Sequence, residues 1–199
     1  MNEDFFGDEA DAPAANPNPL QAAMIDLESM GLRPTAPMAT IGAATFDYRK
    51  MIIGERWYAN VSLASSVALG SVIDPDTVMW WLRQSDDARK ALTRPAMHAS
   101  EALVELSAWM DRNMVERKQR RVWCAGPDAD IVWLREHYIK AGIEVPWEFY
   151  NQRDYRTIRE ELGINVEQDP RVGHHNALDD ALHQIYHLFK IRKALRNGN

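Results

Sequence analysis

Residues 22–31 constrain this sequence most, because an apolar run of strand length there carries two carboxylates, Asp26 and Glu28. Alternate side chains of a strand share a face, so Asp26 and Glu28 point the same way while Leu27 points into the opposite layer. Two like charges at the end of a buried strand repel each other and lose solvation. A divalent cation relieves that cost, since hard cations bind carboxylate oxygens. The alternative is a strand that simply ends in solvent with acidic residues.

The order of the predicted elements indicates an α/β fold. Three strands in hairpin order are followed by helices that alternate with single strands, which is typical of a mixed sheet covered by helices. The predicted strands are 21–28, 38–47, 51–61 and 121–125, with a short extended piece near 147–150. Five helices are predicted. The first begins at Pro75 with Asp74 as N-cap, the second covers 100–113, and the third ends at Gly142. The fourth begins at Tyr155 with Asp154 as N-cap, and the fifth covers 175–195.

The length of 199 residues fits one domain with a sizeable core. Residues 1–19 combine acids, Ala, Asn and Pro, and we expect them to form a flexible lead-in to a folded domain at 20–199. The single cysteine, Cys124, excludes an intramolecular disulfide and a cysteine-based zinc site, and it fits a reducing, cytoplasmic setting. No apolar run approaches the roughly 18 residues of a membrane span, and the acidic N-terminus lacks a signal-peptide pattern.

The net charge of −6 is unusual for a nucleic-acid binder. Cations bound at an acidic site would offset part of that charge. Basic residues also gather in the runs 117–121 and 190–196, each of which is either a phosphate contact or a solvated surface. Charge alone therefore does not decide the class of partner.

Two later stretches carry further candidate site residues. Asp128 and Asp130 stand where a strand turns into a helix, and His175 and Asp180 stand at the start of the last helix. If His175 precedes the first turn, its ring can fold back toward Asp180, and the small Ala177 leaves room for an approaching group. Asp179 and Asp180 are adjacent, so only one of them can face the site, and Asp179 is favoured in the first turn by the helix dipole. The alternative is a capped surface helix with solvated histidines.

Taken together, these stretches resemble the DEDD (DnaQ-like) superfamily of 3′→5′ exonucleases, in the branch whose third motif is His-x-Ala-x-x-Asp. The resemblance covers about residues 22–190 and is greatest to phage and prophage exonuclease VIII-like proteins and small exoribonuclease-like domains. The matching positions are Asp26, Glu28, Asp130, His175, Ala177 and Asp180, with supporting stretches at 25–31, 76–82 and 151–157. The family commonly has Asn-x-Phe-Asp where this chain has Asp128-Ala129-Asp130, which leaves Asp128 as a rival to Asp130.

The resemblance implies a ribonuclease H-like fold and removal of nucleoside 5′-monophosphates from the 3′ end of single-stranded DNA or RNA. It implies two Mg²⁺ or Mn²⁺ ions, with Asp26 bridging them, Glu28 and Asp180 on one ion, and Asp130 acting largely through water. His175 would take the proton from the attacking water. Dimers occur among the relatives, so a homodimer is part of the expectation.

Three further residues are assigned to substrate by the same resemblance. Met30 and Leu32 follow the first motif and would contact the terminal base, and Arg156 would pair with an acid or a phosphate. The adjacent Trp80 and Trp81 are either core residues or a stacking surface for a base. Three rival functions stay open: a short-oligonucleotide hydrolase, an idle nucleic-acid-binding module of the same fold, and an interaction protein with an incidental acidic patch.

Overall fold

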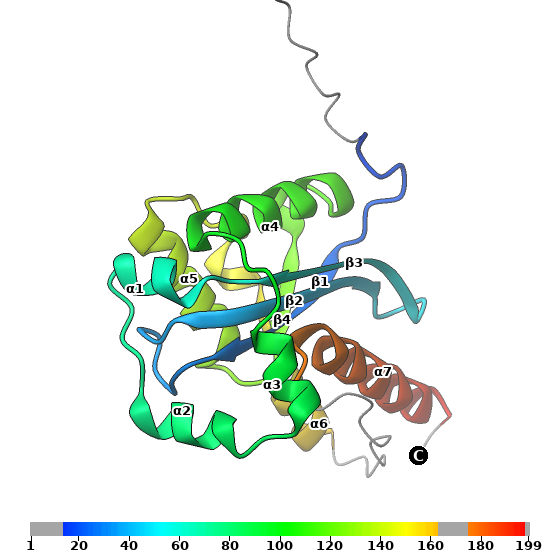
Figure 1. Cartoon of the computed structure of the whole chain (residues 1–199). Helices are drawn as coiled ribbons and strands as arrows, with labels where there is room; N and C mark the ends of the chain where they lie inside the picture. The colour runs from blue at the N-terminus through cyan, green and yellow to red at the C-terminus, as the bar shows by residue number, and fades with distance from the viewer. Residues whose placement is uncertain (1–13, 163–174, 198–199) are drawn as a thin grey trace, which may run out of the picture.

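The computed structural model describes residues 14–162 and 175–197, which form a mixed five-stranded sheet with helices on both faces (Figure 1). The strand order is β3-β2-β1-β4-β5. The pairs β1–β2 and β2–β3 are antiparallel, whereas β1–β4 and β4–β5 are parallel. The strands are β1 (Ala22–Ser29), β2 (Met38–Asp47), β3 (Ile52–Asn60), β4 (Arg121–Cys124) and β5 (Gln152–Asp154). The sheet confirms the predicted α/β, ribonuclease H-like arrangement.

The helices pack in two main layers. Helices α4 and α5 cover one face of the sheet, and α6 and α7 cover the other (Figure 1). The α-helices are α1 (Leu63–Ala68), α2 (Pro75–Leu82), α3 (Asp86–Leu92), α4 (Ala99–Asn113), α5 (Asp130–Ala141), α6 (Tyr155–Glu161) and α7 (Ala177–Arg196), with 3₁₀ turns at η1 (Arg117–Gln119) and η2 (Phe149–Asn151). No helix within the described ranges is long and apolar enough to cross a membrane.

The alternation of side chains along β1 places the acidic pair. Ala23, Ile25 and Leu27 are buried in the core cluster under α4 and α5, whereas Ala22 and Met24 are buried in the cluster under α7. Because the period of a strand is two residues, Asp26 and Glu28 continue the α7 face. The same pattern that fills both cores therefore turns both carboxylates toward the start of α7.

Several local predictions are confirmed by the caps. Asp74 accepts a hydrogen bond from the Asp76 N–H and stands before Pro75 at the start of α2. Asp154 accepts from the N–H groups of Arg156 and Thr157 at the start of α6. Gly142 ends α5 in the left-handed region with φ 66°, which glycine adopts without strain.

Other predictions are corrected. The extended piece expected at 147–150 is instead a 3₁₀ turn followed by β5 at Gln152–Asp154, because pairing with β4 defines the strand. The last helix begins at Ala177 rather than His175, since the Asn176 side chain caps it. Helices α1 and α3 were not predicted from the sequence.

The predicted lead-in lies partly outside the described residues, namely at 1–13. Within its described part, the Asn16 N–H donates to the Arg112 carbonyl oxygen at 2.8 Å, and the Leu20 N–H donates to that of Asn113 at 3.0 Å. This segment therefore runs along the end of α4 before β1 begins. The sequence also predicts a loop at 163–173, which lies outside the described residues.

Candidate active site

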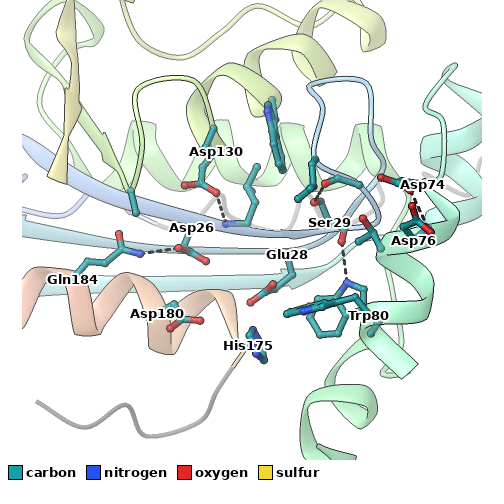
Figure 2. Close-up of a pocket in the computed structure, with 18 of the residues that line it drawn as sticks. Asp26, Glu28, Ser29, Asp74, Asp76, Trp80, Asp130, His175, Asp180 and Gln184 are labelled. Atoms are coloured by element: carbon teal, nitrogen blue, oxygen red, sulfur yellow. Dashed lines mark hydrogen bonds between the residues drawn. The ribbon is translucent and has the colours of Figure 1, made fainter. Parts of the chain in front are cut away.

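Three carboxylates meet where β1 ends and α7 begins. Asp26, Glu28 and Asp180 each offer an oxygen, and these oxygens lie within 4.8 Å of one another (Figure 2). Burial raises the pKa of Asp26 well above its ordinary value, and the neighbouring charges of Asp130, Glu28 and Asp180 raise it further. Oxygen donors this close, with like charges and little solvent, match what a hard divalent cation binds. The donor set thus fits a metal site.

Asp130 approaches the same site from the opposite layer. It is the first residue of α5, is buried, and its Oδ1 accepts a hydrogen bond from the Leu27 N–H at 3.3 Å. Burial raises its pKa to about 6, although backbone N–H groups and Arg156 act in the opposite direction. Asp130 lies outside the close group of three oxygens but lines the same cavity, whereas Asp128 is exposed and does not line it.

His175 faces the site from just before α7. Its φ of 62° is in the left-handed region, which turns the chain before the Asn176 cap. The ring lies edge-to-face against Trp80 and Trp81, with centroids 4.9 and 5.7 Å away. The backbone turn and the two indoles together hold the imidazole beside the acidic cluster (Figure 2).

The tryptophan pair divides into two roles. Trp81 is buried, and its Nε1–H donates to the Ser29 carbonyl oxygen at 3.0 Å. Trp80 is 41% exposed and lines the cavity. Trp81 therefore ties α2 to the end of β1, and Trp80 presents an aromatic surface to whatever enters.

The cavity above the cluster has a volume of about 640 Å³. That volume lies within the usual range of small-molecule sites, about 300–1,000 Å³. Leu32, which is 79% exposed, and Arg156 both line the cavity, and their contact with substrate stays a prediction. Arg156 is the single Lys or Arg side chain among the described residues that line the cavity.

Met30, which we expect to contact substrate, is not among the residues that line the cavity. A register shift between Glu28 and Ser29 interrupts the alternation of β1. The Met30 side chain is instead buried with Ala39, Trp81 and Ala88. Met30 therefore packs in the same core cluster as Trp81.

Two residues that sequence reasoning missed complete the site. Gln184, one turn beyond Asp180 on α7, donates from Nε2 to Asp26 Oδ1 at 2.7 Å. Gly42 pairs with Asp26 across the β1–β2 ladder and lies directly under the first turn of α7. A Cβ at Gly42 would stand 2.2 Å from the Ala177 carbonyl carbon and the Leu178 nitrogen. The room expected at Ala177 is thus filled by the close approach of helix and sheet. Spacing from Asp180 could have indicated Gln184, but no local pattern marks Gly42.

Comparisons with known proteins agree with this geometry. Residues 21–191 match the family described as the Rv2179c-like 3′-5′ exoribonuclease domain. No curated protein matches the chain. Among solved structures, the chain is similar to the zinc-bound exonuclease I–single-stranded DNA complex of E. coli, with a TM-score of 0.66, 12% identity, and coverage of 90% of this chain and 42% of the other.

Two further solved structures share the fold. Exonuclease I from Methylocaldum szegediense gives a TM-score of 0.63 at 13% identity, covering 86% of this chain and 40% of the other. The nuclease domain of 3′hExo, a DEDDh family member bound to rAMP, gives a TM-score of 0.56 at 15% identity, covering 89% of this chain and 92% of the other. The chain thus spans less than half the length of the exonuclease I chains and nearly the whole of the 3′hExo nuclease domain.

Proposed function

Because the chain belongs to the Rv2179c-like 3′-5′ exoribonuclease domain family, we propose that it releases nucleoside 5′-monophosphates from the 3′ end of single-stranded RNA with a divalent metal. The observation that carries the proposal is the cluster of Asp26, Glu28 and Asp180, with Asp130 and His175 on the same cavity. An idle binding module has no need of three crowded carboxylates beside a held imidazole. An incidental acidic patch would lie in solvent, whereas Asp180 is buried.

The carboxylates would hold two Mg²⁺ or Mn²⁺ ions. When bound, such ions supply Lewis acidity to the attacking and leaving oxygens of a phosphodiester. Asp26 lies centrally, with Glu28 beside it on the strand and Asp180 facing it from α7. Asp130 stands farther away, and its bond to the Leu27 N–H fixes one oxygen, so we assign it contact through water.

His175 would act as the general base. A water positioned between the ring and the scissile phosphate would give its proton to an imidazole nitrogen, and histidine is the side chain that most often accepts a proton in this way. The edge-to-face contacts with Trp80 and Trp81 limit rotation of the ring. The ring therefore needs little reorganisation before it accepts the proton.

Arg156 and Leu32 would contact the substrate. A Cβ built at Gly126 would lie 3.5 Å from Arg156 Nη1, so the glycine leaves space beside the guanidinium. A guanidinium matches the planar arrangement of two phosphate oxygens. Leu32 would contact the terminal base, and Trp80 adds an aromatic face that bases stack on.

The test uses paired single strands of RNA and DNA, labelled at the 5′ or the 3′ end, with Mn²⁺ or with chelator. A ladder that shortens progressively from the 3′ end of RNA, only with metal, is the expected result. Equal cleavage of DNA would widen the substrate to either sugar, a choice that rests on contacts to one 2′-hydroxyl. Internal cuts, or cleavage in chelator, would refute the proposal. A homodimer in the cytoplasm stays a prediction, for which sedimentation gives the oligomeric state.

A further inference from the structure

The two polar atoms of the Gln184 side-chain amide differ: one makes a short hydrogen bond, and the other has no hydrogen-bond partner among the described residues. Its side chain is 7% exposed, and Nε2 donates to Asp26 Oδ1 at 2.7 Å. Within the described part of the chain, its Oε1 is buried and finds no hydrogen-bond partner. A buried acceptor without a donor is destabilising.

The orientation of the amide is fixed by charge. Turning the amide over would place Oε1 against the Asp26 carboxylate, which is repulsive, and would lose the one hydrogen bond that the Gln184 side chain makes among the described residues. Figure 2 shows the nitrogen turned toward Asp26. The unsatisfied Oε1 is therefore a consequence of holding the carboxylate.

The chemical type of the donor is also informative. The terminal torsion of an Asp side chain is broad, so a carboxylate that must offer both oxygens to metal needs a partner to fix its plane. A Lys or Arg in this position would fix it but would bring a positive charge that competes with cations for the carboxylates. An amide fixes the plane while leaving the charge of the cluster unchanged. It also joins Asp26 on β1 to the helix that carries Asp180.

We propose that Gln184 is a positioning residue that fixes the plane of the Asp26 carboxylate and sets it against Asp180 for metal binding. The inference rests on the proposed metal role of Asp26. Residues that orient a metal ligand by hydrogen bonding typically contribute about 10–100-fold to metal affinity or activity. Removing the amide should therefore weaken the metal site while the fold persists.

The experiment replaces Gln184 with Met, which keeps length and volume but donates nothing, and titrates Mn²⁺ into the full chain by calorimetry without nucleic acid. We expect Mn²⁺ affinity to fall about 10-fold or more. The melting temperature in chelator should change little, because relief of the unpartnered Oε1 offsets the lost bond to Asp26. In hydrolysis the loss should appear in kcat, with KM for RNA unchanged.

Two further variants keep the result interpretable. Gln184→Ala removes the amide with a smaller side chain and should also weaken Mn²⁺ binding. Ile185→Met is the matched control, because Ile185 is the next residue of α7 but is buried in the cluster with Met24 and Leu188. It should keep wild-type affinity. Wild-type affinity in both Gln184 variants would overturn the inference alone, whereas a wild-type chain that binds no Mn²⁺ would overturn the metal site itself.

Discussion

Gly42→Ala should disable the site from a position that contacts no substrate. The added Cβ would lie 2.2 Å from two backbone atoms of α7, whereas ordinary contact begins at 3.4 Å. A shift of about 1.2 Å between the helix and the sheet would restore ordinary contact. Asp180 and Gln184 would move with the helix, away from Asp26 on β1.

The expected loss follows from that displacement. A misplacement of about 1 Å costs on the order of 100-fold in rate, and inserting a methyl into a packed core costs about 1–3 kcal/mol of stability. We therefore expect Gly42→Ala to remain folded, with a lower melting temperature and about 100-fold slower hydrolysis of single-stranded RNA at saturating Mn²⁺. Single-turnover kinetics and thermal unfolding measure the two effects.

Gly54→Ala is the matched control for crowding in the same sheet. A Cβ there would meet the Thr45 Oγ1 at 2.5 Å and the Leu20 Cδ1 at 2.8 Å, which are side-chain atoms on the edge-strand side and can rearrange. This variant should lose some stability and keep hydrolysis within a few-fold of wild type. Full activity in Gly42→Ala, or an equal loss in Gly54→Ala, would refute the assignment of Gly42 to positioning α7.

Three other outcomes are expected. His175→Ala should slow the chemical step about 10²–10⁴-fold while Mn²⁺ affinity measured by calorimetry is kept; unchanged turnover would remove His175 from the role of base. Trp81→Phe loses the bond to the Ser29 carbonyl, so unfolding in urea should show about 0.5–1.5 kcal/mol less stability, with slower hydrolysis as the His175 ring loosens. The folded-state pKa of Asp130 is raised from 3.8 to about 6 by burial, so its contribution to stability is fully present below pH 3.8 and is lost as pH rises through 6. In chelator, stability relative to Asp130→Asn should therefore fall as the pH rises from 4 to 7, and a flat difference would contradict the burial of that carboxylate.

Local patterns in the sequence were enough to predict the strands and the acidic residues. The apolar run before Asp26 and Glu28 predicts both the strand and the shared face, because side-chain alternation depends only on strand geometry. Asp74 and Asp154 were recognisable as caps, since capping is a contact within three residues. The buried Asp180 and exposed Asp179 likewise follow from helix geometry.

What could not be predicted depends on contacts between distant segments. The close approach of Gly42 to Ala177 joins residues 135 positions apart, and the bond from Gln184 to Asp26 joins residues 158 apart. The burial of Met30 follows from the register shift between Glu28 and Ser29, and no residue type in the sequence marks that shift. Both missed helices, α1 and α3, are short and have caps provided by the common residues Ser62 and Ser85.

The most direct measurement compares the wild-type chain with Asp26→Asn on 5′-labelled single-stranded RNA, under single-turnover conditions with saturating Mn²⁺. Asparagine keeps the shape but removes the central charge of the cluster, and metal polarisation contributes several kcal/mol to such reactions. We predict metal-dependent shortening by the wild type and a rate at least about 1,000-fold lower in Asp26→Asn, with the fold retained. Hydrolysis by Asp26→Asn at the wild-type rate would contradict a metal-dependent site built on this carboxylate.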